Sequence, residues 1–250
     1  MIWLLSIPAL WFLGKKALWL YALDATIKQH RLAKITIYPG DISQFEQMDQ
    51  RKLEDLTHEL QELGFTVLGD LVSELDSAPA TPSPTSVETT TKGISRVFGN
   101  FENGCYATLT SVVGVTRLAP ELNRPPVVET APFRTVILSL SGNDEDSWGF
   151  ATHNREIQPF SVLHRHPRQL SHRFIGADAR ELLTSHLAER DSIAARGNFR
   201  WESQTSLAEY LRFEERGLRQ NLGHKVLCLL LVRLGGRNDH AIALINHKNK

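Results

Sequence analysis

The sequence predicts an α+β protein in which an N-terminal hydrophobic helix precedes an antiparallel sheet of about five to six strands with helices on one face. Three observations support this fold class. A 22-residue apolar run occupies residues 2–23, β-strand patterns with two hairpin turns follow one another between residues 94 and 154, and amphipathic helical patterns stand before and after those strands. The order helix, strands, helices is typical of an α+β domain.

The apolar run is the first element and the most ambiguous one. As a helix it measures about 33 Å, which is enough for a hydrocarbon core of ~30 Å. Lys15 and Lys16 interrupt it, and the penalty of about 5 to 7 kcal/mol for two lysines nearly cancels the gain of about 3 to 6 kcal/mol from its apolar side chains. Three arrangements stay open: a bilayer span, an interfacial helix that bends at Gly14, and a segment that is soluble or cleaved.

Tryptophan and lysine positions favour membrane attachment. Trp3 and Trp19 lie about 24 Å apart along a helix, the separation expected of two interfacial belts. No basic residue precedes the run and five interrupt or follow it by residue 34, so the positive-inside rule predicts a cytoplasmic location for residues 39–250. We expect residues 1–38 to form a single-pass or monotopic anchor whose contact residues are Trp3, Trp11, Lys15, Lys16 and Trp19.

The residues after the anchor predict a strand, a long helix and a second strand. "KITIY" reads as a strand, and Asp41 with Gln44 resembles a capping box that begins a helix. Apolar residues at helical spacing continue to Leu63, and Gly64 ends the helix. "FTVLGDLVSEL", residues 65–75, predicts the next strand.

The middle of the chain predicts a flexible loop and two hairpins. Residues 77–93 are rich in Pro, Ser and Thr and predict a flexible loop. "ISRVFGNF" and "CYATLTSVVGV" flank an Asn-Gly turn, and "FRTVILSLS" and "SWGFATHN" flank the acidic turn "GNDED". A Pro-rich connection at residues 118–132 separates the hairpins, and "FSVLH" predicts one more strand.

Helical patterns return near the C-terminus. Residues 178–196 predict one helix that ends at Gly197, and Ser206 with Glu209 forms a capping box for another. Residues 225–234 fit a helix or a buried strand equally well. Residues 39–250 are therefore assigned to one α+β domain.

The motifs "LQELGFTVLGDL" and "ARELLTSHLAER" resemble those of a set of uncharacterised bacterial membrane-attached proteins, in which a similar helix end precedes an α+β domain. The resemblance covers residues 41–223 by the order of elements. It implies membrane attachment and implies no catalytic residue.

Charge and cysteine content restrict the function classes. The 28 basic and 28 acidic residues balance, so the chain has no overall attraction for nucleic acid. The distribution is uneven, since residues 41–150 carry seven basic and seventeen acidic groups and residues 151–250 carry sixteen and ten. Two cysteines, Cys105 and Cys228, are too few for a disulfide-stabilised secreted scaffold and fit reduced thiols in a cytosolic-facing domain.

Familiar catalytic and metal motifs are incomplete. "HELQE", residues 58–62, has Glu62 where a zinc-protease motif needs its second histidine, and "LSLSG" has Leu138 where a nucleophile elbow needs its first glycine. His186, near the apolar face of its helix, is expected to be a core or boundary histidine with its hydrogen bonds satisfied. We therefore expect no catalytic residue, no metal and no cofactor.

The segment "HRHPRQLSHRF" is the candidate contact for an anion or a lipid headgroup. Two histidines in a His-x-His pattern would share one face of a strand, but no nearby carboxylate or thiolate completes a metal site. A loop of solvated basic residues is the simpler interpretation. The residues concerned are His164, Arg165, His166, Arg168, His172 and Arg173.

The function predicted from these observations is that of a membrane-anchored, non-catalytic accessory or interaction protein. Its expected partners are membrane lipid and another membrane protein, with no nucleic acid. Two alternatives remain: a module that binds a lipid or another apolar ligand between a helix and a curved sheet, and an enzyme with an unrecognised site.

Overall fold

The computed structural model describes residues 34–76, 88–117, 127–141, 148–155, 169–197 and 200–219. They form an eight-stranded sheet of order β1-β2-β3-β4-β6-β7-β8, in which β5 also pairs with β4. Three α-helices and one 3-10 helix accompany the sheet. The elements are β1 (Lys34–Pro39), η1 (Ile42–Gln44), α2 (Gln50–Glu62), β2 (Thr66–Asp76), β3 (Glu88–Asn100), β4 (Cys105–Arg117), β5 (Val127–Thr130), β6 (Arg134–Ser141), β7 (Trp148–His153), β8 (Gln169–Arg173), α3 (Ala179–Gly197) and α4 (Leu207–Arg219).

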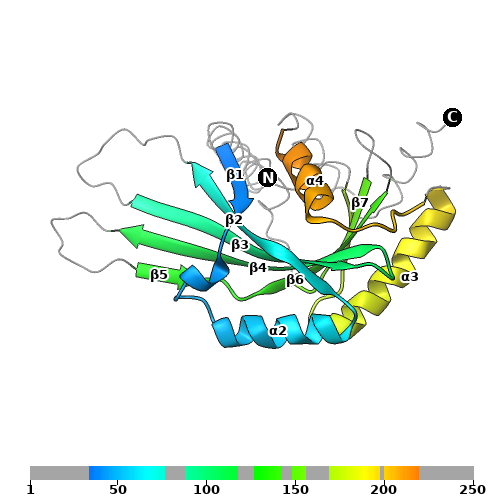
Figure 1. Ribbon diagram of the computed structural model, residues 1–250, viewed down its shortest axis with the longest axis horizontal. Coiled ribbons are helices and arrows are strands. Elements are labelled where there is room, and N and C mark those ends of the chain that lie inside the picture. The colour runs from blue at the N-terminus through cyan, green and yellow to red at the C-terminus, as the bar shows by residue number, and fades with distance from the viewer. Residues whose placement is uncertain are drawn as a thin grey trace, which may run out of the picture.

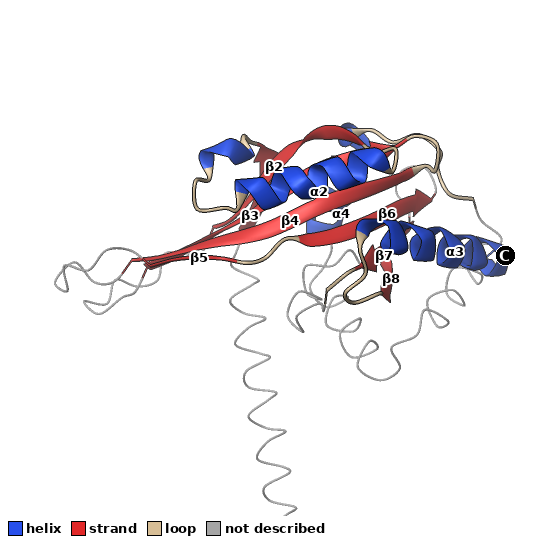
Figure 2. Ribbon diagram, turned by 90° about the horizontal axis from the view of Figure 1, so that it is seen from below, coloured by secondary structure: helices blue, strands red, loops and turns tan. Residues whose placement is uncertain are grey.

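Helices cover both faces of the sheet. Figures 1 and 2 show α2 and α3 on one face and α4 on the other. The predicted α+β class is confirmed, but the prediction of helices on one face is wrong. The physical reason is visible in β4, whose alternate side chains are apolar on both sides: Leu109 packs in the cluster beneath α2, and Tyr106 packs in the cluster beneath α4.

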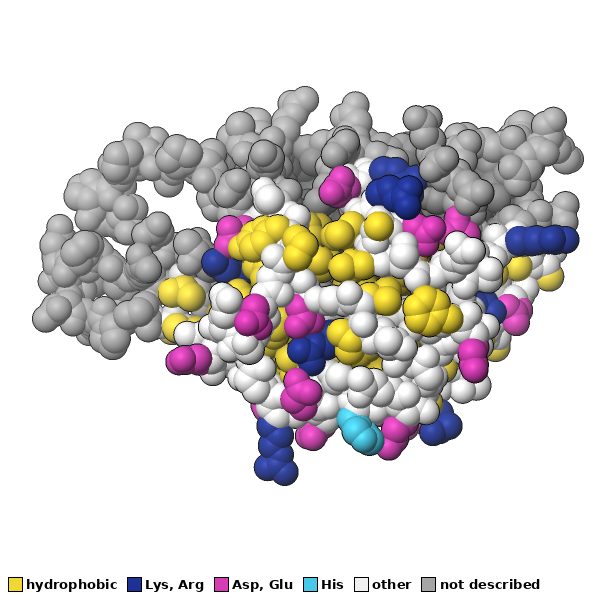
Figure 3. Space-filling model, viewed as in Figure 1, with side chains coloured by type: hydrophobic (Ala, Val, Ile, Leu, Met, Phe, Trp, Pro, Cys, Tyr) yellow, Lys and Arg dark blue, Asp and Glu magenta, His cyan; other side chains and the backbone are white. Residues whose placement is uncertain are grey.

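Each face has its own apolar core. Leu53 and Leu60 of α2 and Leu182 of α3 pack against the sheet on one side. Tyr210 and Phe213 of α4 pack against it on the other side. The outer surface of α2 is solvated, and Figure 3 shows charged side chains along it, with hydrophobic side chains gathered above them over β1 and β2. The charged outer face of α2 and its buried apolar face are the two sides of an amphipathic helix.

The helix predicted to begin at Asp41 is divided in two. The Asp41 side chain accepts a hydrogen bond from the Ser43 N–H at 2.9 Å and caps only η1. A second aspartate, Asp49, accepts from the Lys52 N–H at 2.9 Å and begins α2. Two competing N-caps eight residues apart therefore interrupt what the apolar spacing presented as one helix. Gly64, at φ 82°, follows the helix end as predicted.

Both predicted hairpins are present, and the strands extend further than expected. β3 pairs with β4 from Glu88↔Arg117 to Asn100↔Cys105, and β6 pairs with β7. Gly104 takes φ 58° in the first turn, where a Cβ would collide with the backbone at Glu202, so the turn requires glycine there. Residues 88–93, which the composition assigned to the flexible loop, belong to β3; residues 77–87 lie outside the described residues.

Two strands occur where the sequence predicted none. β5 lies inside the Pro-rich connection and pairs with β4. β8 lies inside the segment interpreted as a basic loop and runs parallel to β7, so the sheet is not wholly antiparallel. The predicted strand "FSVLH" and the ambiguous residues 225–234 lie outside the described residues.

The predicted hydrophobic helix also lies outside them, because the described chain begins at Lys34. Residues 34–38, which the sequence analysis placed at the end of the anchor segment, form most of β1 and pair with β2. None of the helices in the described ranges has the length and apolar character needed to cross a membrane.

Candidate functional site

The structure describes two of the residues predicted to contact membrane or anions. His172 and Arg173 are consecutive in β8, so their side chains point to opposite faces of the sheet. His172 is half-buried with its Nε2 3.4 Å from the Ser185 hydroxyl of α3, and Arg173 is exposed. The other predicted residues lie outside the described ranges: Trp3, Trp11, Lys15, Lys16, Trp19, His164, Arg165, His166 and Arg168. The headgroup contact therefore stays a prediction.

The core beneath α3 contains a histidine between two hydroxyl groups. His186 is fully buried, and its Nε2 and Nδ1 atoms each lie 2.9 Å from a hydroxyl oxygen, those of Ser139 in β6 and Thr152 in β7. Its ring stacks on Phe150 with 4.9 Å between centroids. The prediction of a satisfied core histidine is confirmed.

Burial also decides what this cluster can do. Removal from water lowers the pKa of His186 to about 3, so the ring is neutral and each ring nitrogen matches one hydroxyl. Ser139 and His186 have the spacing of a nucleophile and its base. Both side chains are fully buried, however, so a substrate has no access to the serine oxygen. We conclude that the cluster stabilises the packing of α3 on the sheet.

The lowered pKa predicts a pH-dependent stability. The unfolded chain binds a proton at His186 near pH 6.5 and the folded chain only near pH 3, so the stability contributed by the neutral ring is fully present above pH 6.5 and is lost as the pH falls toward 3. The expected loss at pH 5 is about 2 kcal/mol.

Urea unfolding at neutral pH and at pH 5 measures this loss. The control is the triple variant Ser139→Ala/Thr152→Val/His186→Leu, which has no imidazole at this position. An equal drop in stability in both proteins would show that His186 does not titrate as described.

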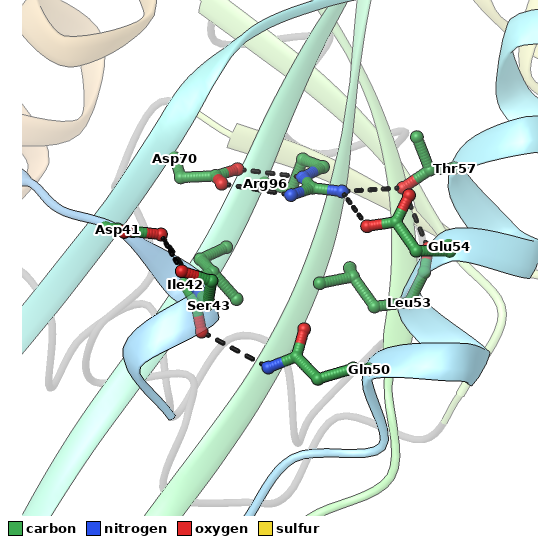
Figure 4. Close-up of polar contacts among 9 residues, drawn as sticks. All are labelled: Asp41, Ile42, Ser43, Gln50, Leu53, Glu54, Thr57, Asp70 and Arg96. Carbon is green, nitrogen blue, oxygen red and sulfur yellow. Dashed lines mark hydrogen bonds and ion pairs between the residues drawn. The ribbon is translucent and has the colours of Figure 1, made fainter. Parts of the chain in front are cut away.

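A second polar cluster joins the sheet to α2 (Figure 4). Arg96 of β3 donates from Nε and Nη2 to the two carboxylate oxygens of Asp70 in β2, at 2.9 and 3.1 Å. Its Nη1 donates to Glu54 and Thr57 of α2, both at 3.1 Å. The Asp70 carboxylate raises the pKa of Arg96, which keeps the guanidinium charged. The bidentate ion pair joins β2 to β3, and the Nη1 hydrogen bonds hold α2 over these two strands.

Cys105 is a further buried group without a chemical role. It is a free cysteine at the start of β4, and burial raises the pKa of its thiol to about 12. A thiol with this pKa is protonated and unreactive. The expectation of a reduced thiol holds for Cys105, while Cys228 lies outside the described residues.

An accessible feature of the described residues is a cavity of about 480 Å³ between α2, the β5–β6 link and the start of α3, which we name the α2–α3 groove. Apolar side chains contributed by four parts of the chain line much of it. Hydroxyl groups from β4, β5 and β6 add polar atoms. The apolar residues are Met48, Leu56, Ala131, Pro132, Phe133, Ala177 and Ala179, and the hydroxyl residues are Ser111, Thr130 and Thr135.

The acidic side chains of the groove are already engaged by helix N-termini. Asp49 accepts from the N–H of Lys52, as described for the cap of α2, and Asp178 accepts from the Glu181 N–H at 2.8 Å at the start of α3. Glu59 of α2 accepts a hydrogen bond from the Ala179 N–H at the start of α3, at 3.0 Å. These bonds satisfy backbone donors and complement both helix dipoles.

The basic side chains of the groove, unlike the acidic ones, have no bonding partner of their own in the described residues. Lys52 and Arg155 both line it, and within the described ranges neither makes an ion pair. The groove therefore offers two cations without an ion pair, next to three carboxylates that accept backbone N–H hydrogen bonds. A ligand with its own carboxylate would find electrostatic partners there.

Two exposed apolar side chains lie in the loop that leads to Ala177, a residue of the groove. Phe174 and Ile175, in the β8–α3 loop, are 40% and 57% exposed. The loop is tied to the end of β7 by hydrogen bonds from Phe174 N–H to His153 C=O and from Gly176 N–H to Asn154 C=O, at 2.9 and 3.0 Å. Sequence reasoning missed this site because its walls come from distant segments, and no local motif marks their meeting.

Comparison with known proteins supplies no function to transfer. No protein-family model, no curated protein and no solved structure matches this chain. The resemblance to bacterial membrane-attached proteins stays a prediction, and function has to be argued from the groove, the buried clusters and the N-terminal sequence.

Proposed function

We propose that this protein is a membrane-attached, non-catalytic accessory protein whose cytoplasmic α+β body binds a partner protein. The observation that carries the proposal is the α2–α3 groove, an accessible hollow with two cations that make no ion pair in the described residues. The exposed Phe174 and Ile175 lie in the loop that leads to its Ala177. Apolar side chains beside an accessible hollow are typical of an interaction surface.

The buried clusters support the non-catalytic part of the proposal. The serine–histidine pair of Ser139 and His186 has no access to solvent, and its hydrogen bonds hold three elements together. Arg96 likewise serves a structural ion pair. These two clusters therefore serve the fold.

The position of β1 supports a close attachment to the membrane. Residues 24–33, ten residues, separate the apolar run from β1. Fully extended, they reach at most about 35 Å. If residues 2–23 are held in the bilayer, the body cannot move far from the lipid surface, and its partner is expected to be a membrane protein.

Membrane extraction tests the attachment. We expect the full-length chain to pellet with membranes at physiological ionic strength. Resistance to alkaline carbonate would indicate a span, and release by carbonate would indicate an interfacial helix. The matched variant Leu10→Asp/Phe12→Asp/Leu13→Asp keeps the whole chain and is expected to move to the supernatant. Wild-type protein in the high-speed supernatant would contradict the proposal.

The alternative of an apolar-ligand module is favoured by one observation, the volume of the groove. A cavity of about 480 Å³ falls in the size range of small-molecule sites. Native mass spectrometry of the protein released from membranes distinguishes the two: a co-purified lipid or small molecule at one equivalent supports the ligand module, and bare protein supports the interaction protein.

A further inference from the structure

The sheet has a short open edge beside the α2–α3 groove. β5 pairs with β4 from Thr116↔Val127 through Val113↔Thr130, and β6 pairs with an earlier part of the same side of β4. In the described part of the chain, no strand pairs with the other side of β5. All four β5 residues are exposed.

Hydrogen-bond alternation shows which β5 groups face outward. Ala131 donates its N–H to the Val112 C=O at 2.8 Å and continues the same register. In an antiparallel ladder, alternate residues bond to the partner strand. Val127, Glu129 and Ala131 therefore face β4, and the N–H and C=O groups of Val128 and Thr130 face away from it.

The side chains of these two residues lie on the groove side of the sheet. Val128 is opposite Val115, which packs against the core beneath α2, and Thr130 lines the groove itself. A strand added to this edge would continue the same pleat, so every second side chain of that strand would point to the groove side. The open edge and the cavity thus form one continuous surface.

We propose that the β5 edge and the α2–α3 groove together bind an extended peptide segment of a partner protein. The segment adds to the sheet beside β5 through main-chain hydrogen bonds with Val128 and Thr130, places an apolar side chain in the groove, and brings an acidic side chain to Lys52 and Arg155. This inference rests on the proposed function and names the site and the partner chemistry.

Two features favour a peptide over a lipid. The outward N–H and C=O groups of β5 alternate donor and acceptor along the edge, and an extended backbone matches that pattern whereas acyl chains do not. Lys52 and Arg155 line the groove and make no ion pair within the described residues. An acidic side chain of the peptide can therefore pair with these two cations, although the groove also holds three carboxylates. An acidic side chain then gains charge-assisted hydrogen bonds.

Selection from a displayed library of random peptides of about ten residues tests the proposal on the full-length protein in phosphatidylcholine and phosphatidylglycerol nanodiscs. We expect enriched peptides to alternate apolar residues with others and to carry Asp or Glu. Binding of an enriched peptide is then compared in four proteins by fluorescence anisotropy: wild type, Val128→Pro, Val128→Thr and Lys52→Glu/Arg155→Glu.

Val128→Pro removes the outward N–H and leaves the β4 ladder intact, so we expect affinity to fall about tenfold or more while the urea midpoint stays near that of wild type. Val128→Thr keeps the N–H and the branched shape, and its affinity should stay within about twofold. The Lys52→Glu/Arg155→Glu variant should lose about tenfold.

Three outcomes would overturn the inference. They are no enrichment of any peptide, equal binding by Val128→Pro and wild type, and displacement of the bound peptide when lipid vesicles alone are added. None of them alters the membrane-extraction result, so failure of the inference and failure of the proposed function are distinguishable. A folding defect in Val128→Pro would be seen in its urea midpoint, and Thr130→Pro, which removes the neighbouring outward N–H, then takes its place.

Discussion

Replacing His186 with Leu is expected to lower the free energy of unfolding by about 4 kcal/mol, the largest effect of any single substitution considered for this protein. The leucine leaves the hydroxyls of Ser139 and Thr152 buried without partners, each at a penalty of about 1 to 3 kcal/mol. It also removes the stacked contact with Phe150. Urea unfolding of the full-length chain in detergent measures the change.

The triple variant Ser139→Ala/Thr152→Val/His186→Leu provides the control. It removes all three polar partners together, and replacing a whole hydrogen-bonded set by apolar groups of similar shape is close to neutral. We expect it to recover at least about half of the stability lost in His186→Leu. A triple variant that is less stable than the single one would show that the hydroxyls were not the origin of the loss.

Replacing Arg96 with Met is expected to lower the free energy of unfolding by about 3 kcal/mol. The methionine keeps the length of the apolar stem but leaves Asp70, whose side chain is only 19% exposed, without its two hydrogen bonds. It also releases Glu54 and Thr57, so α2 loses these two polar contacts with β3.

Arg196→Met is the matched control for Arg96→Met. Arg196 of α3 makes an ion pair with Glu189 at 3.3 Å in which both side chains are substantially exposed. Exposed ion pairs contribute little, and we expect a change below about 0.5 kcal/mol. Equal effects of the two substitutions would mean that the Arg96 pair has no special role in holding α2.

The local parts of the fold were predictable from the sequence. The Asn103-Gly104 turn fixes the first hairpin, because Gly104 takes a positive φ, and Gly64 follows the end of α2 for the same reason. Ser206 caps α4 through the Glu209 N–H at 3.2 Å, as the capping box predicted. Each of these signals operates within a few residues, so sequence spacing alone reveals it.

The non-local parts were not predictable. No signal within a few residues distinguishes two short helices with competing caps from one long helix. The sequence therefore did not predict the division between Asp41 and Asp49. The parallel pairing of β8 with β7 depends on where the intervening chain leads. The α2–α3 groove joins segments that are more than a hundred residues apart, such as Glu59 and Ala179.

Amide hydrogen exchange along residues 127–131 of the full-length protein in nanodiscs tests the central claim most directly. An open β5 edge predicts an alternating pattern: the Val128 and Thr130 amides exchange at least about tenfold faster than those of Glu129 and Ala131, whose N–H groups face β4. Addition of a selected peptide should then protect Val128 and Thr130. Slow exchange at both residues in the free monomer would contradict the account, because another part of this chain would already occupy the edge.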